Sequence, residues 1–237
     1  DVISGKVMLI APEGFMRAAI EENVFAGNAM SRRLQWQYAM LLPRDPLGHV
    51  DQAIGKNIAI GSSGLIAPTR LIKGDIETIT LDGVEMVFQN VPDTEAPVEM
   101  NTYFPQFKTL WSSELVTGTI HNIYTLRGAA VRDALNWSKE INNTLWKFGQ
   151  DAEVMFASHS WPRWGNDRIQ EVLRTQRDAY ANLNNQALHY ANQGVTINEI
   201  HNVYQVPKSL QQQWAARSYH GDVQNNSRAV INRFLGF

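Results

Sequence analysis

The chain has 237 residues, of which 44% are hydrophobic and 19% charged, with 16 Gly, 9 Pro and no Cys. This composition is that of a globular protein and excludes collagen-like, disordered and disulfide-stapled chains. The net charge of −2, from 21 basic and 23 acidic residues, argues against nucleic acid or an anionic membrane as a partner.

The first residues show neither a signal-peptide pattern nor an initiator Met. No apolar run in the chain approaches the ~18 to 20 residues of a membrane span. The chain opens at Asp1 and enters an apolar, strand-like segment at 7–11 almost at once. We therefore expect a chain that starts in mid-fold.

Elements in the first half alternate between strand and helix patterns. After the strand at 7–11, residues 16–42 predict one or two helices that end before Pro43. Residues 43–70 are rich in Gly, Pro and Ser, which predicts a long loop around a short strand. A hairpin is expected at 75–91, because Asp82-Gly83 tolerates the positive φ angles of a two-residue turn.

The remaining elements complete a sheet and then a helical region. Further strands are predicted at 99–104, 108–112 and 152–158, with a helix at 129–149. Beyond Pro162 the pattern is helical, and the expected helices are 167–193, one opened by the capping box Thr196–Glu199, one from Pro207, and 225–234. The prediction is an α/β region over 1–165 followed by an all-α region over 166–237.

Three polar stretches follow predicted strands, where α/β sheets place their ligands. They are residues 92–99, 114–133 and 158–164. Taken singly, each signal has a second interpretation. The acids could be solvated turn residues, and His159 could be a structural histidine. Arg127 and Arg132 could be ion-pair partners instead of groups that bind an anion. None of the six histidines forms a compact metal motif.

A set of motifs that follow one another along the chain supports one common function for these stretches. In order they are A-P-E-G-F (11–15), G-N-A-M-S-R-R (27–33), L-I-A-P-T (65–69), T-E-A-P (94–97), H-N (121–122), T-L-R-G-A (125–129), R-D (132–133) and W-P-R-W-G (161–165). With them the chain resembles the alkylsulfatase branch of the metallo-β-lactamase superfamily, enzymes that hydrolyse dodecyl sulfate and related esters. The resemblance implies the second half of a metallo-β-lactamase αββα sandwich, followed by an all-α dimerisation region.

The resemblance also implies a catalytic centre with two zinc ions. Glu95 of T-E-A-P would ligate one ion, Glu114, nineteen positions on, would bridge both, and His159 before W-P would ligate the second. The metals held by these three residues would activate a bound water molecule for hydrolysis.

Sulfate would be bound by polar side chains from the H-N, T-L-R-G and R-D motifs. They are Asn122, Arg132 and, nearby, Arg127. Guanidinium groups suit this role because their donors match the oxygens of a tetrahedral anion.

Two departures from the family pattern qualify this picture. Ser160 stands where the family usually has a second His, and the motif H-x-H-x-D-H, which supplies most of the family's metal ligands, is absent from the 237 residues. We therefore expect a fragment of a longer enzyme, with the remaining zinc ligands outside this chain.

The predicted function is hydrolysis of an alkyl sulfate to an alcohol and inorganic sulfate by a homodimer. The family resemblance suggests a periplasmic or secreted enzyme. The alternative is a catalytically incomplete fragment or pseudoenzyme that binds anionic amphiphiles or only dimerises. Three ligands are too few for a binuclear site, so the isolated chain is expected to bind zinc poorly and to have little activity.

Overall fold

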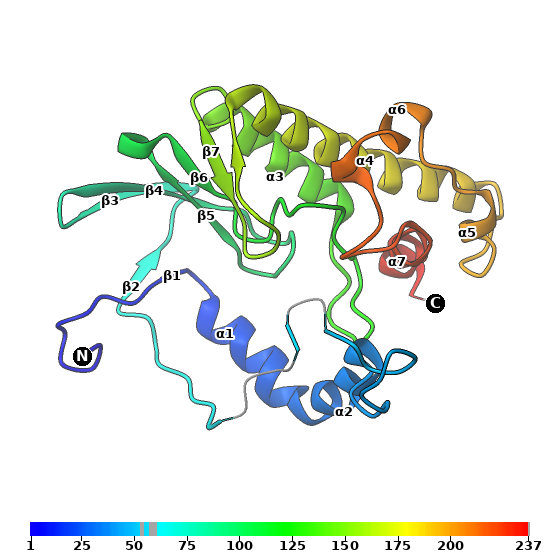
Figure 1. Ribbon diagram of the computed structural model, residues 1–237, viewed down its shortest axis with the longest axis horizontal. Coiled ribbons are helices and arrows are strands. Elements are labelled where there is room, and N and C mark those ends of the chain that lie inside the picture. Colours follow the sequence, from blue (N-terminus) through cyan, green and yellow to red (C-terminus); the bar gives the residue numbers. More distant parts are fainter. Residues whose placement is uncertain (53–54, 57–60, 237) are drawn as a thin grey trace. The chain divides into compact units, whose positions relative to one another are not determined.

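The computed structural model describes residues 1–52, 55–56 and 61–236. Its internal contacts divide the chain into two units, which are treated separately below. One comprises Asp1–Leu71 and Thr125–Ala130, and the other comprises Ile72–Tyr124 and Val131–Phe237 (Figure 1). No described helix is both long and apolar enough to cross a membrane.

The first unit consists mainly of helix and loop. Two helices, α1 (Phe15–Ile20) and α2 (Gly27–Tyr38), flank a π-helical turn at Glu21–Phe25. Helix α2 ends at Ala39, whose φ of 51° takes the chain out of the helix. The prediction of one or two helices over 16–42 is confirmed.

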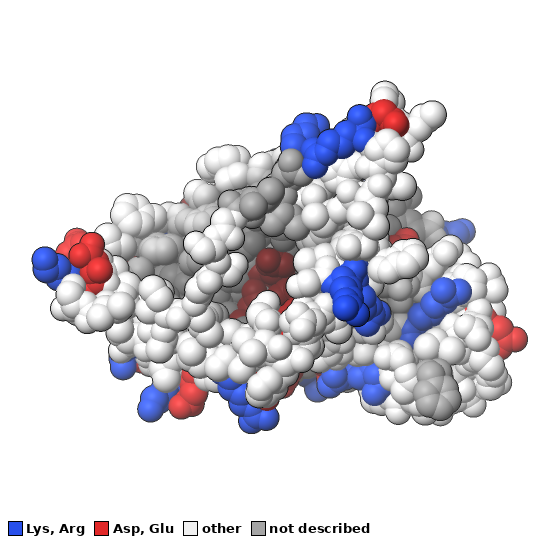
Figure 2. Space-filling view, turned by 90° about the horizontal axis from the view of Figure 1, so that it is seen from below, with Lys and Arg blue, Asp and Glu red and all other residues white. Residues whose placement is uncertain are grey.

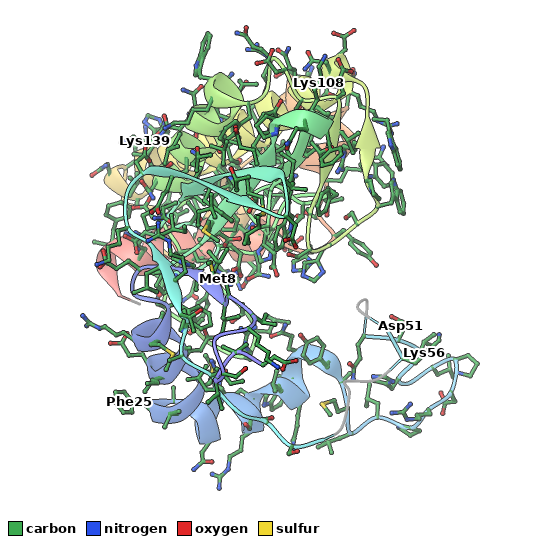
Figure 3. All side chains as sticks on the ribbon, turned by 90° about the vertical axis from the view of Figure 1, so that its left-hand side faces the viewer. Met8, Phe25, Asp51, Lys56, Lys108 and Lys139 are labelled. Carbon is green, nitrogen blue, oxygen red and sulfur yellow. The ribbon has the colours of Figure 1, made fainter. Side chains whose placement is uncertain are left out.

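The strand predicted at 7–11 is shorter and lies later, at β1 (Ile10–Pro12). Its partner β2 (Arg70–Ile72) is only three residues long, which limits the pairing. In the part of the 43–69 loop that the structure describes, no strand forms. Asp51 and Lys56 lie on this loop (Figure 3), and Nζ of Lys56 is 3.4 Å from Oδ2 of Asp51.

The second unit contains a six-stranded sheet in the order β3-β4-β5-β6-β7-β8. The strands are β3 (Ile76–Leu81), β4 (Val84–Asn90), β5 (Met100–Phe104), β6 (Thr109–Trp111), β7 (Val154–Phe156) and β8 (Arg163–Trp164). The β3-β4 turn has φ angles of 49° at Asp82 and 79° at Gly83, which confirms the predicted hairpin. Within this sheet, β6 and β7 pair in parallel and the other neighbouring strands pair antiparallel. The two-residue strand β8 is not among the strands predicted from the sequence.

Helix α3 (Ala134–Lys147) connects β6 to β7. It begins five residues later than predicted because the side chain of Asp133 accepts the N–H of Asn136 and caps the helix there. Helix α4 (Asn166–Asn192) follows and packs against α3 (Figure 1). Gly194, with a φ of 90°, lies just beyond its end, as predicted.

Short helices fill the chain after α4. They are α5 (Ile200–Val203), α6 (Lys208–Gln211), a 3-10 turn at Trp214–Ala216 and α7 (Val223–Leu235). The predicted all-helical region is therefore confirmed, and so is the mixed α/β character of the chain.

The core of the second unit lies between the sheet, α3, α4 and α7. Trp137, Ile141 and Leu173 are fully buried there. Charged side chains, by contrast, are dispersed on the face drawn in Figure 2, with blue and red residues interspersed among white ones. This distribution agrees with the near-neutral net charge.

Candidate metal and anion site

The predicted ligands Glu114 and His159 follow the parallel strands β6 and β7, and the structure brings them together. Glu114 Oε1 lies 3.4 Å from Nε2 of His159. The third predicted ligand, Glu95, lies in the loop after β4, where the buried hydroxyl of Thr94 donates to the carbonyl of Val91 at 2.7 Å.

His121 joins these acids at the centre of the cluster. Its Nε2 lies 3.2 Å from Glu114 Oε2 and 4.0 Å from Glu95 Oε1. The imidazole is buried, and its ring centroid lies 5.5 Å from that of Trp137 on α3. The sequence identifies His121 only as part of the H-N motif, and the structure adds its position between both carboxylates.

Hydrogen bonds to imidazoles keep Glu114 ionised. Burial opposes the charge, but the bonds to His121 and His159 outweigh it and hold the pKa of Glu114 well below its usual range. Reciprocally, the bond to Glu114 raises the pKa of His159 against the effect of burial. Glu114 and His159 thus stabilise each other's charged forms.

Glu99 contacts the backbone of Glu114 and is not among the site residues predicted from the sequence. Its Oε1 accepts the backbone N–H of Glu114 at 2.8 Å, whereas its buried Oε2 has no hydrogen-bond partner among the described residues. Burial, together with the charge of Glu95, raises the pKa of Glu99 to about 8. The sequence signal was a second acid four residues after the Glu of T-E-A-P.

Asn122 and Arg132 form one polar unit beside the acids. Arg132 donates to Asn122 Oδ1 at 2.6 Å and to the Asn122 carbonyl at 2.9 Å. The other end of the guanidinium is ion-paired with Glu95. The two predicted sulfate-binding residues are therefore neighbours, and one of them already contacts a predicted metal ligand.

Arg127 belongs to the other unit. There it is ion-paired with Glu22 at 3.0 Å and donates to Gln37 at 3.3 Å. Its sulfate-binding role stays a prediction.

His220 lies in the turn before α7, and no sequence motif marks it as a site residue. Its ring centroid lies 4.2 Å from that of His121 and 4.5 Å from that of His159. Burial, reinforced by these two histidines, lowers the pKa of His220 to about 4, which keeps the imidazole neutral at pH 7. Only a contact between residues about a hundred positions apart brings it here, so no local pattern could have found it.

The donors present suit a divalent metal such as zinc. Ligand atoms of Glu114, His121 and His220 all lie within 4.8 Å of one another. A carboxylate and neutral imidazoles are ordinary zinc ligands. The hydroxyl of Ser160, next to His159, accepts the N–H of Gly118 at 3.1 Å.

Comparison with known proteins shows which proteins the chain is similar to. A family model described as alkyl sulfatase dimerisation matches residues 196–237. The whole chain aligns with an alkyl/aryl-sulfatase of Saccharomyces cerevisiae at 46% sequence identity, and the alignment covers 37% of that protein's length. It aligns with an (R)-specific secondary-alkylsulfatase of Pseudomonas at 44% identity, over 36% of that protein's length.

A solved structure agrees in fold. The stereoselective inverting sec-alkylsulfatase Pisa1 from Pseudomonas superposes on 100% of the chain with a TM-score of 0.95 and 44% identity, over 38% of its own length. The chain thus spans little more than a third of these relatives. Sequence and fold together confirm the resemblance to the alkylsulfatases from one end of the chain to the other.

Proposed function

We propose that this chain is the part of a zinc-dependent alkylsulfatase that carries Glu95, Glu114 and His159, and that the whole enzyme hydrolyses alkyl sulfate esters to an alcohol and inorganic sulfate. One observation carries the proposal: the acid and imidazole cluster lies directly beside the Asn122–Arg132 pair. Metal ligands and anion-binding donors are thus within one hydrogen-bonded network.

Each group has a proposed task. Glu95, Glu114 and His159 would hold two zinc ions together with ligands from outside this chain, and Glu114 would contribute to holding both. His121 and His220 are further candidate metal ligands, because their ring nitrogens lie within 4.8 Å of a Glu114 carboxylate oxygen. A bound zinc pair supplies a Lewis acid and lowers the pKa of water.

The amide of Asn122 and the guanidinium of Arg132 would bind the sulfate oxygens. The hydrogen bond from Arg132 to Asn122 Oδ1 keeps the two side chains adjacent, and the positive charge of Arg132 would compensate the anion. Arg127 is a further proposed sulfate ligand. Because the guanidinium of Arg132 contacts both Glu95 and Asn122, sulfate bound by Arg132 would lie next to a proposed metal ligand.

Isotope labelling tests the reaction and its course. The full-length protein, incubated with an alkyl sulfate in ¹⁸O-labelled water, should release alcohol and sulfate. Label in the alcohol means carbon–oxygen cleavage, and label in the sulfate means sulfur–oxygen cleavage. A zinc-replete protein that releases neither product would contradict the proposed function and favour an amphiphile-binding or dimerising protein.

A homodimer is the second part of the proposal, formed through the all-α region 166–237 that follows the α/β region 1–165. The family model described as alkyl sulfatase dimerisation supports it. Large apolar side chains are also exposed at the end of α7, with Phe234 at 54% and Leu235 at 66%. Light scattering of the purified protein should give twice the monomer mass, and the Phe234→Ser, Leu235→Ser double variant should shift it towards the monomer.

A further inference from the structure

The segment 120–123 leads from the sheet towards α3 and carries Asn122. It makes hydrogen bonds to the backbone and side chains of residues that are distant in the sequence. On its N-terminal side, Tyr180 Oη of α4 accepts the N–H of His121 at 2.9 Å. The carbonyl of Ile120 accepts the N–H of Gly221 at 2.8 Å. The segment therefore depends on the helical region for its conformation.

Asn226, on α7, makes two of these bonds with a single side chain. Its Oδ1 accepts the N–H of Ile123 at 2.8 Å, and its Nδ2 donates to the carbonyl of His121 at 2.9 Å. The residue is completely buried. An amide side chain offers the same donor and acceptor as a peptide group, so Asn226 pairs with the backbone on both sides of Asn122 as a neighbouring strand would.

The close approach of the chain before α7 to the same segment leaves little room for movement. A Cβ atom on Gly221 would lie 2.3 Å from the carbonyl carbon of His121, so a side chain there would push the two segments apart. Asn122 Nδ2 in turn donates to the carbonyl of His220 at 3.3 Å. Asn226 thus holds the backbone on either side of Asn122, and the adjacent His220 carbonyl holds the Asn122 side chain.

We propose that Asn226 is a positioning residue for substrate binding: it holds Asn122 in the orientation that meets the sulfate group. The inference rests on the proposed sulfate-binding role of Asn122. Because a displacement of about 1 Å can reduce a rate a hundredfold, loss of both bonds should lower kcat/KM by about 10- to 100-fold, chiefly through KM.

Hydrogen exchange tests the positioning without reference to activity. In Asn226→Ala, amides within 120–124 should exchange faster than in the wild type, while amides of the sheet keep their protection. The matched control is Gln224→Ala, an exposed position on the same helix. If Asn226→Ala fails to fold, Asn226→Asp serves instead, because it keeps the acceptor for Ile123 and loses only the donor to His121. Unchanged exchange in the variant would overturn the proposal.

A double-mutant cycle tests the functional coupling in the full-length enzyme. If Asn226 acts through Asn122, its replacement should raise KM in the wild type but have little further effect in an Asn122→Ala background. Independent, additive effects would contradict a positioning role. A wild-type protein without sulfatase activity would refute the proposed function, and the exchange measurement would still decide whether Asn226 orders the segment.

Discussion

Arg132 Nη1 donates to Asn122 Oδ1 at 2.6 Å, and the same guanidinium is ion-paired with Glu95. One side chain therefore links a predicted metal ligand to a predicted sulfate ligand. Because the Arg132 side chain is only 10% exposed, these contacts are shielded from competing water. The link predicts that metal binding at Glu95 and anion binding at Asn122 are coupled through Arg132.

The first prediction concerns the planar fork of Arg132. In Arg132→Lys the positive charge remains but the paired donors are lost, so KM for an alkyl sulfate should rise by about tenfold or more. Steady-state kinetics of the full-length enzyme would measure this. Arg174→Lys is the control, because Arg174 is exposed on α4 and donates only to Gln170 among the described residues. Equal KM values for the two variants would show that Arg132 has no role in binding the ester.

The second prediction concerns Glu114 as the central metal ligand. Its carboxylate contacts both His121, at 3.2 Å, and His159, at 3.4 Å. Glu114→Gln removes the negative charge at nearly constant size, so zinc retained after dialysis should fall further than in Glu95→Gln. Elemental analysis of the full-length protein would report the zinc content.

Control measurements for the second prediction use Glu171→Gln, at an exposed position on α4. It should retain the wild-type zinc content. Wild-type zinc content in Glu114→Gln as well would remove Glu114 from the ligand set.

The elements that local sequence determines were predicted well. Asp82-Gly83 specified its hairpin because only residues that tolerate positive φ angles form that turn. The end of α4 was predictable for the same kind of reason, because Gly194 adopts a φ of 90°. The start of α3 was wrong by five residues, since the side chain of Asp133 and not the apolar pattern determines where the helix begins.

The site was predictable only in part, for a different reason. Glu114 and His159 follow neighbouring parallel strands, so their proximity follows from the topology. His220, in the turn before α7, and Asn226, on α7, contact His121 although they lie about a hundred residues further along the chain. Such contacts arise from tertiary packing, which no local pattern encodes.

The third prediction uses two tryptophans on one helix. Trp137 is fully buried and donates from Nε1 to the carbonyl of Leu115 at 2.7 Å, whereas Trp146 is 64% exposed. Trp137→Ala should therefore destabilise the fold by about 3–5 kcal/mol, because it leaves a cavity next to the segment that carries Glu114. Trp146→Ala should change stability by less than about 0.5 kcal/mol. Urea unfolding curves would measure both, and similar midpoints would contradict the packing described for α3.

The last prediction is the pH dependence of the hydrogen bonds between Thr196 and Glu199, in the turn that precedes α5. Glu199 Oε2 accepts the hydroxyl of Thr196 at 2.7 Å and its backbone N–H at 3.0 Å. The bond from the hydroxyl, followed by that from the N–H, lowers the pKa of Glu199 from its ordinary value of 4.5. A depressed carboxyl pKa means that the unfolded chain binds the proton more tightly, so the contribution to stability is present above pH 4.5 and is lost as the pH falls below it. Glu199→Gln should therefore lower the urea midpoint at pH 7, and the difference from the wild type should shrink at pH values below the folded-state pKa. A difference that stays constant, or grows, on acidification would mean that the charge of Glu199 does not stabilise the start of α5.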